Sequence, residues 1–359
     1  MSETVYIRPI GFAPGPQSEE GDAVRLAGGL IYASRFAVIL RKDGRVVERW
    51  RASPESIALV LGQLPDSVGA EAETQWANLR KAHPPLELGA RTIRVDQPQV
   101  MGILNVTPDS FYDGGRYGAT EAAIARGREM AAHGADIIDV GGESTRPGAP
   151  GVPEAEEHER VVPVIAALAA ELEIPVSIDS RKPAIARAAV AAGAALINDV
   201  GGLRDPEMIA TVAELGVPAV VMHMQGTPET MQRDPDYNDI VGNVKAWLAE
   251  RVAAAEAAGV AREQLIVDPG IGFGKTLEHN LALMARLGEF QGIAGGVLLG
   301  ASRKSWLEAL SGAAPELRLP GSLAAATAGA LTGADIVRVH DVAATRQAMD
   351  VANALREFK

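Results

Sequence analysis

Short runs of apolar residues, each ending in polar residues, recur along the chain from about residue 100 onward. An apolar run of roughly four to eight residues bounded by turn residues is typical of a strand buried on both faces of a parallel sheet. We predict eight such strands, at 100–106, 136–140, 175–178, 195–198, 219–223, 265–267, 296–299 and 336–339. Between them lie alanine-rich amphipathic segments that predict helices, among them 120–133, 154–171 and 240–258.

The alternation of strand and helix indicates the fold class. Eight strand-helix units over about 260 residues match the (β/α)8 TIM barrel in number and length. A doubly wound sheet is the alternative α/β fold, but it usually has fewer strands and a glycine-rich first turn. We therefore predict a (β/α)8 barrel over residues 86–359, preceded by an extra small α+β segment over residues 1–85.

The first 85 residues carry a different pattern and no motif that suggests a role. Two apolar stretches, 36–40 and 45–50, flank Arg41-Lys42-Asp43-Gly44 and predict a β-hairpin. Further on we predict a helix from Ser53 to Leu64, a helix over 70–82, a boundary at Pro84-Pro85, and a strand over 91–95 that closes the barrel floor.

Composition limits the classes of ligand and the cellular location. The 359 residues carry a net charge of −12 and no cysteine, which excludes disulfides and thiolate metal sites. The acidic balance disfavours nucleic acid and anionic membranes, so any anionic ligand requires a local cluster of cations. Neither an apolar run of about 18 residues nor a signal-peptide pattern is present, and we expect a cytoplasmic protein.

Each predicted strand delivers polar residues at its carboxyl end, where active sites of such barrels lie. Taken singly, these residues have ordinary explanations: Asp and Asn form turns, His223 packs in the core, and Arg181 and Arg303 form structural ion pairs. Their coincidence at one end of the barrel predicts a real site. The residues concerned are Asn105, Thr145, Arg146, Asp179, Asn198, Asp199, His223, Asp268, Ser302, Lys304, Arg338 and His340.

Two sets of side chains define the chemistry of that site. Carboxylates and amides, which suit a flat heterocycle with several N–H donors, are supplied by Asp179, Asn198 and Asp268. Groups that suit a phosphate or carboxylate are supplied by Arg146, Lys304, Arg338 and His340. A heterocyclic diphosphate ester would use both sets.

With these residues in view, the chain from about 95 to 357 resembles the dihydropteroate synthase family of folate synthesis. Seven stretches carry the resemblance, in family order: 105–111, 142–148, 178–180, 197–199, 268–275, 302–305 and 338–341. The resemblance implies a transferase that joins 6-hydroxymethyl-7,8-dihydropterin diphosphate to p-aminobenzoate, releasing pyrophosphate with Mg²⁺. It also implies a homodimer that is a target of sulfonamides.

The resemblance assigns roles residue by residue. The pterin would be held by Asp179, Asn198, Met222, Asp268, Phe273, Gly300 and Lys304. The diphosphate would be held by Asn105, Arg338 and His340, with Asn105 also near Mg²⁺. The p-aminobenzoate pocket would be shaped by Phe111, Thr145, Arg146, Pro147 and Ser302. The catalytic residues would be Asp179, Lys304, Arg338 and His340.

Two other functions remain open from the sequence. A pterin-dependent methyltransferase would share the barrel and part of the pterin pocket, but would not use the diphosphate-binding cations. A non-catalytic pterin-binding paralogue or partner subunit would be expected to lose loop residues first, whereas Asn105, Asp109, Thr145 and Arg146 are all present. The first 85 residues leave the oligomeric state open.

Overall fold

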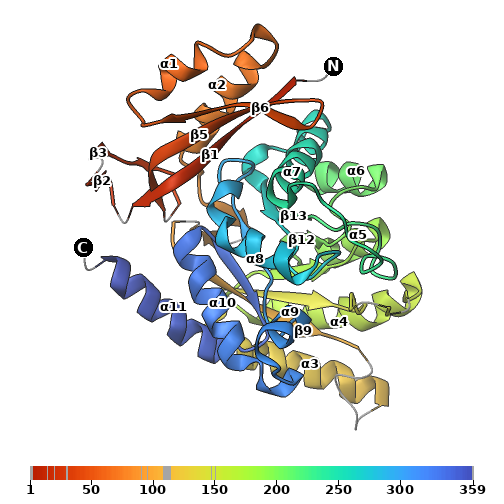
Figure 1. Ribbon diagram of the computed structural model, residues 1–359. Coiled ribbons are helices and arrows are strands. Elements are labelled where there is room, and N and C mark those ends of the chain that lie inside the picture. The colour runs from red at the N-terminus through yellow and green to blue at the C-terminus, as the bar shows by residue number, and fades with distance from the viewer. Residues whose placement is uncertain are drawn as a thin grey trace.

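The computed structural model describes residues 3–13, 15–19, 21–29, 31–89, 91–94, 96–107, 115–146, 148–149 and 151–357. A barrel makes up the larger part of the chain, and the N-terminal strands with two helices form a smaller unit against its outside (Figure 1). Among the described residues, no helix combines the length and apolar character that crossing a membrane requires.

Eight parallel strands form the barrel, which confirms the predicted fold. They are β9 (Gln99–Asn105), β10 (Ile137–Gly141), β11 (Val176–Asp179), β12 (Leu196–Asp199), β13 (Ala219–Met222), β14 (Leu265–Asp268), β15 (Leu298–Leu299) and β16 (Ile336–Val339). Each strand pairs with the next from β9 to β14, and β16 pairs with both β15 and β9. A single parallel bridge, Val267 to Val297, closes the circle between β14 and β15.

Only two residues of the predicted strand 296–299 join the sheet as β15. The backbone N–H of Val297 donates to the Asp335 carboxylate at 2.8 Å instead of to a neighbouring strand. A side chain therefore replaces a strand partner at this position, where only an isolated bridge forms.

Helices follow most of the strands and surround the barrel. They are α3 (Gly115–Ala132), α4 (Glu154–Glu171), α5 (Pro183–Ala191), α6 (Pro206–Leu215), α7 (Ile240–Ala257), α8 (Leu277–Ala285), α9 (Ser305–Ser311), α10 (Leu319–Thr332) and α11 (Val342–Glu357), with 3-10 turns η2 (Arg262–Gln264), η3 (Leu287–Phe290) and η4 (Pro315–Leu317). Side-chain caps define several starts. For example, Asp205 accepts from the N–H of Glu207, with Pro206 at the first helical position.

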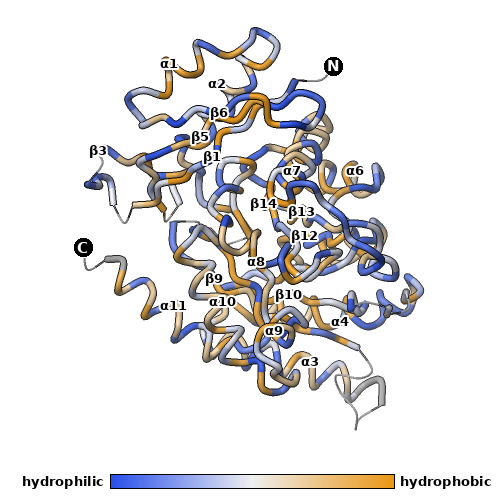
Figure 2. The backbone as a smooth tube through the Cα atoms, viewed as in Figure 1, coloured by the Kyte–Doolittle hydropathy of each residue, from blue (hydrophilic) through white to orange (hydrophobic). Residues whose placement is uncertain are grey.

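The barrel has an apolar floor at the amino ends of its strands. Leu86, Leu88 and Ile93 lie on a hairpin of β7 (Leu86–Leu88) and β8 (Arg91–Ile93). They pack against the first residues of the strands, such as Met101 and Ile137. The strand expected at the floor is thus confirmed for 91–93. Hydrophobic residues run along the barrel strands in Figure 2, and polar residues collect in the loops.

An antiparallel sheet forms the N-terminal unit. Its strands are β1 (Glu3–Ala13), β4 (Val24–Arg25), β5 (Tyr32–Lys42) and β6 (Arg45–Ala52); β2 (Gln17–Ser18) and β3 (Gly21–Asp22) form a separate short pair. The predicted hairpin is confirmed as β5–β6. Its turn needs only Asp43 and Gly44, whose φ angles of 49° and 77° lie in the left-handed region that two-residue hairpins require.

The two predicted helices of this unit have different bounds in the structure. The helix expected from Ser53 to Leu64 is wrong at both ends, because α1 covers only Ile57–Leu61. The Ser56 hydroxyl accepts from the N–H of Ser53, which makes 53–56 a turn, and Gly62 follows the helix. The helix expected over 70–82 is α2 (Asp66–Arg80). It starts directly after Pro65 and therefore includes Gly69.

The N-terminal unit has its own hydrophobic cluster, centred on Phe36, Val38 and Trp76. The Phe36 and Trp76 rings meet edge to face, with centroids 4.9 Å apart. Polar contacts join this unit to the barrel: Arg8 pairs with Glu289 at 2.7 Å, and Lys81 with Glu263 at 2.6 Å. The division of the chain at residue 85 stays a prediction.

Because the two clusters are separate, a core deletion in one should spare the other. We expect Phe36→Ala to destabilise the N-terminal unit by about 3–5 kcal/mol, the usual cost of removing a fully buried phenylalanine. Urea unfolding followed by fluorescence of Trp50 and Trp76 measures this. Leu59→Ala, on the exposed face of α1, is the matched control and should change little; equal effects of both variants would contradict the packing described.

Candidate functional site

At the carboxyl end of the barrel, residues of four neighbouring strands lie side by side in the sheet register. Asn105 lies beside Gly141, Gly141 beside Asp179, and Asp179 beside Asn198. On the next pair of strands, Met222 lies beside Asp268. The barrel thus brings the polar strand ends that the sequence singled out to one place, and Asp179, Asn198 and Asp268 are all buried there.

A half-buried arginine connects two buried carboxylates at the centre of this site. Arg338 on β16 donates from Nε to Asp139 Oδ2 and from Nη2 to Asp179 Oδ2, both at 2.6 Å. Asn198 donates to the same Asp139 oxygen at 2.9 Å. Four strands, β10, β11, β12 and β16, are therefore joined by one hydrogen-bonded cluster, which we call the Arg338 cluster (Asp139, Asp179, Asn198 and Arg338).

Burial and neighbouring charges shift the pKa values of two members of this cluster, Asp179 and Arg338. Burial raises the pKa of Asp179 to about 7, with the positive charge of Arg338 acting in the opposite direction. Burial alone would lower the pKa of Arg338, but Asp139 and Asp179 outweigh it and hold the pKa above its usual value. Arg338 therefore stays charged, and Asp179 gains from any further donor that approaches it.

Lys304 lies in the loop after β15, just before α9. Its ammonium lies 4.3 Å from the centre of the Phe273 ring and donates to the Ile271 carbonyl. Burial lowers the pKa of Lys304 to about 8, although the charge of Asp268 opposes the shift. A Cβ at Gly300 would lie 3.7 Å from both Lys304 Nζ and Asp268 Oδ2, so the glycine keeps the space between these charged groups open.

His340 and Ser302 form a hydrogen-bonded pair near the Arg338 cluster. Ser302 Oγ lies 3.0 Å from His340 Nδ1 and accepts from the backbone N–H of His340 at 3.3 Å. Burial lowers the pKa of His340 to about 4, helped by the charges of Arg338 and Arg303. The imidazole is thus neutral at pH 7; with the Ser302 hydroxyl donating to Nδ1, the ring proton is on Nε2.

The remaining predicted residues are less tightly placed. Asn105 at the end of β9 and Thr145 are half-buried, and Arg146 is exposed with no ion pair among the described residues. Met222 is buried in a cluster with Phe273. Two predicted residues, Phe111 and Pro147, lie outside the described residues.

Several ordinary explanations from the sequence also hold. Arg303 pairs with Asp341 at 2.8 Å and Arg181 with Glu143 at 2.9 Å, so both arginines form structural ion pairs. Asp199 accepts from the N–H groups of Gly201 and Leu203 and therefore forms a turn. These contacts fix the loops around the site rather than presenting groups to a ligand.

His223 is a core histidine, as expected, with its ring against Trp247. Its Nδ1 lies 3.0 Å from the ammonium of Lys275. Burial lowers the pKa of Lys275 to about 7, and the lysine also donates to the Phe273 carbonyl at 2.9 Å. Lys275 therefore holds the backbone at Phe273 in position.

Asp139 is the central residue that the sequence reading missed. It is fully buried, and its Oδ1 has no hydrogen-bond partner among the described residues. A carboxylate inside the apolar run Ile137-Ile138-Asp139-Val140 was the available signal, because a buried charge requires partners. An unpartnered buried oxygen beside Asn198 is also a place where a ligand donor can bind.

Comparisons with known proteins agree with this arrangement. Residues 101–340 match the family described as pterin binding enzyme. The chain is 48% identical over 268 residues to the dihydropteroate synthase of Escherichia coli (strain K12), covering 75% of this chain and 95% of that protein. It is similar to the crystal structure of Xanthomonas albilineans dihydropteroate synthase with 4-aminobenzoic acid, with TM-score 0.73, 48% identity and coverage of 77% and 99%.

One further relative matches beyond the barrel. The probable bifunctional folylpolyglutamate synthase/dihydropteroate synthase of Halobacterium salinarum is 47% identical over 333 residues, covering 92% of this chain and 39% of that protein. A match of this length extends into the N-terminal unit. At least part of that unit is therefore similar to a segment of a larger protein.

The Arg338 cluster should contribute strongly to stability. We expect Asp139→Asn to lower the free energy of unfolding by about 3–5 kcal/mol, because it removes the fully buried charge of the pair and leaves half-buried Arg338 with one carboxylate fewer. Urea denaturation of the purified variant measures this. Glu171→Gln, which removes the exposed partner of Arg128, is the control and should be nearly silent; a silent Asp139→Asn would mean that the cluster is not stabilising.

Proposed function

Because the chain belongs to the pterin binding enzyme family as a dihydropteroate synthase, we propose that its site joins 6-hydroxymethyl-7,8-dihydropterin diphosphate to p-aminobenzoate. The observation that carries the proposal is that acceptors and donors lie side by side in one site. Asp179, Asn198 and Asp268 are buried acceptors, and Arg338, Lys304 and His340 supply donors beside them. A pterin diphosphate presents the complementary groups.

The carboxylates and the amide bind the pterin in this proposal. The ring donates N–H groups to Asp179 and Asp268, whose pKa values burial raises, so hydrogen bonds to the ionised forms are strong. The Oδ1 of Asp139, which has no hydrogen-bond partner among the described residues, is a further acceptor two residues before the Asp179 level in the strand register. Met222 and Phe273 form the apolar walls, and Gly300 leaves room for the flat ring.

The cations stabilise the leaving group. Arg338 uses Nε and Nη2 for its carboxylates, which leaves Nη1 for a diphosphate oxygen. The Nε2–H of neutral His340 donates to the same group. The C–O bond to diphosphate breaks with its electron pair moving to oxygen, and the pterin carbon bears positive charge that the nearby carboxylates stabilise.

The amine of p-aminobenzoate then forms the C–N bond with that carbon and loses a proton to the medium or to pyrophosphate. An arylamine is already a neutral nucleophile, so no side chain needs to act as general base. The pocket for p-aminobenzoate is proposed to use Thr145, Arg146 and Ser302, together with Phe111 and Pro147.

The residues present fit a Mg²⁺ ion that is held mainly by substrate. No cluster of three or more acidic or histidine side chains that could hold a metal is found in the described part of the chain. Mg²⁺ commonly takes one or two protein oxygens and completes its shell with phosphates and water. Asn105 would supply such an oxygen, and the ion would neutralise charge on the diphosphate. The homodimeric state and the cytoplasmic location stay predictions.

Lys304 tests the proposed chemistry. We expect Lys304→Ala to lower kcat/KM by roughly 10²–10³, comparable to losing a donor that stabilises transition-state charge. Pyrophosphate release from the pterin diphosphate and p-aminobenzoate is the measurement. The control is Lys42→Ala in the N-terminal sheet, which should keep full activity.

The pH profile separates this role from a structural one. Lysine is cationic below its pKa, so kcat/KM of the wild type should fall as pH rises through about 8. Lys304→Arg should move that decline to higher pH, since arginine stays charged. Absence of pyrophosphate release in the wild type would exclude the proposed reaction and favour a methyltransferase or a non-catalytic pterin-binding protein.

Arg146 tests the order of binding. Its exposed side chain lacks an ion pair among the described residues, and it would gain one only when diphosphate is bound. We expect p-aminobenzoate to bind poorly to free enzyme and better with pterin and Mg²⁺-pyrophosphate present, with a coupling of about 1–3 kcal/mol. Calorimetric titration under both conditions measures it.

Arg146→Ala should reduce this coupling and leave pterin binding unchanged, because the pterin residues lie on the strands instead. Arg126→Ala, on the surface of α3, is the matched control and should retain the coupling. Equal affinity for p-aminobenzoate in free and loaded wild-type enzyme would mean that the second pocket exists before diphosphate binds.

A further inference from the structure

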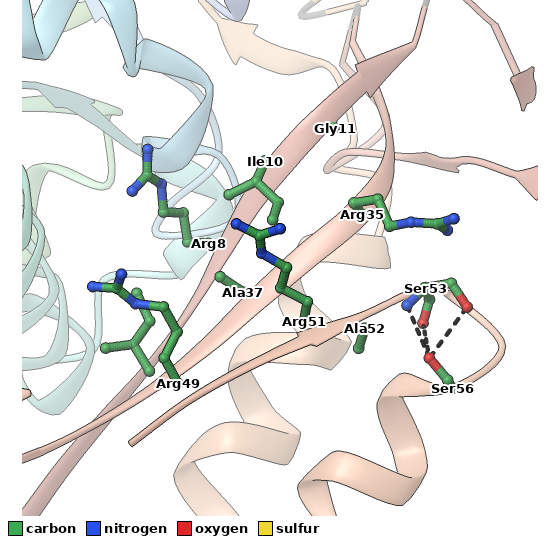
Figure 3. A pocket seen from close by; sticks show the side chains of 11 residues that line it. Arg8, Ile10, Gly11, Arg35, Ala37, Arg49, Arg51, Ala52, Ser53 and Ser56 are labelled. Carbon is green, nitrogen blue, oxygen red and sulfur yellow. Dashed lines mark hydrogen bonds between the residues drawn. The ribbon is translucent and has the colours of Figure 1, made fainter. Parts of the chain in front are cut away.

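The N-terminal sheet carries a large cavity outside the barrel site. Its volume is about 760 Å³, within the usual range for small-molecule sites. Figure 3 shows the side chains that line it, which come from β1, β5 and β6 of the sheet and from the turn of Ser53 and Ser56. None of its lining residues belongs to the proposed active site.

Four arginines line this cavity, from three strands: Arg8, Arg35, Arg49 and Arg51. In a chain of net charge −12, such a group of cations on one face is unexpected. Figure 3 shows the guanidinium groups of Arg8, Arg49 and Arg51 around Ile10 and Ala37, with Arg35 extending toward the serine turn. The cavity therefore has cations on several sides of one space.

The charges in this cavity are only partly neutralised. Arg8 pairs with Glu289, and the charge of Arg35 lies close enough to Glu55 to lower the pKa of that exposed carboxyl, after a Ser53 hydrogen bond as the main cause. Arg49 and Arg51 have neither an ion pair nor a side-chain hydrogen bond within the described ranges. Two exposed guanidiniums thus remain for a ligand.

The cavity continues toward the barrel. A second space of about 450 Å³ shares Arg8 and Arg49 and adds Arg41 and Arg286. These two added arginines pair with Asp239, and Arg286 also pairs with Glu289, so both are largely neutralised. Arg49 is shared by the two spaces and has no ion pair among the described residues. The floor of the larger cavity is apolar where Ala37 and Ile39 are buried.

We propose that this cavity binds a phosphorylated small organic molecule. One guanidinium fork matches one planar carboxylate, whereas several guanidiniums around one volume suit a group whose oxygens point in several directions, as phosphates do. The apolar floor formed by Ala37 and Ile39 contacts the organic part. This site is independent of the proposed reaction in the barrel.

Calorimetric titration of the full chain with ADP tests the site. We expect one ADP to bind per chain, more weakly as salt is raised, and adenosine to bind at least about tenfold more weakly, because it lacks the charged group. Arg49→Gln/Arg51→Gln should weaken ADP binding at least about tenfold. Arg45→Gln, on the same strand but outside both cavities, is the matched control and should bind like the wild type.

Binding to the barrel is distinguished with His340→Ala, which removes a proposed diphosphate donor there and should keep ADP affinity if the N-terminal cavity is the site. The double arginine variant should melt like the wild type and keep pyrophosphate release, since its positions are exposed. The proposal is overturned if ADP does not bind at millimolar concentration, or binds the double variant equally well. Tighter binding of triglutamate than of ADP would also overturn it, because the arginines would then bind carboxylates. Loss of a dimer in the double variant would overturn it as well, because the arginines would then contact a second copy of the chain.

Discussion

The hydrogen-bonded position of Arg338 between Asp139 and Asp179 is the interaction on which the site depends. Two carboxylates this deeply buried require positively charged or hydrogen-bonding partners. The arginine donates to one oxygen of each and joins strands that are far apart in the sequence. It can do so only because β16 returns to β9 and completes the barrel on that side. The contacts that close the barrel on this side therefore also neutralise the charges of the site.

Much of the barrel could be predicted from the sequence because its strands are buried on both faces, and apolar runs such as Ala219–Met222 end abruptly at a polar residue. The helix after Ser53 could not, since a local bond between Ser56 and Ser53 replaced the expected cap. The long strand β1 gave little signal, because only alternate residues such as Val5 and Ile7 face the core. The role of Asp139 could not be predicted, because it depends on which strands are neighbours in the barrel.

The sequence predicted that polar residues gather at the carboxyl ends of the strands, but not how they pair with one another. Ser302 was expected in the p-aminobenzoate pocket, and the structure brings it against His340 instead of leaving it unpaired. Their sequence separation of 38 residues hides a contact between the loops after adjacent strands. Arg338 was expected to bind diphosphate, yet two of its nitrogens are used by carboxylates. Such pairings follow from sheet register, which a single sequence does not reveal.

The short β15 gives the barrel a seam. Between β14 and β15 the ladder is reduced to the single bridge of Val267 and Val297, whereas the other neighbours share longer registers. Local opening of the backbone requires the least free energy where the fewest hydrogen bonds must break. Asp268 ends one side of this seam, and the loop with Gly300 and Lys304 leaves the other. The wall where the pterin is proposed to bind is therefore also the part of the barrel best able to widen around an entering ring.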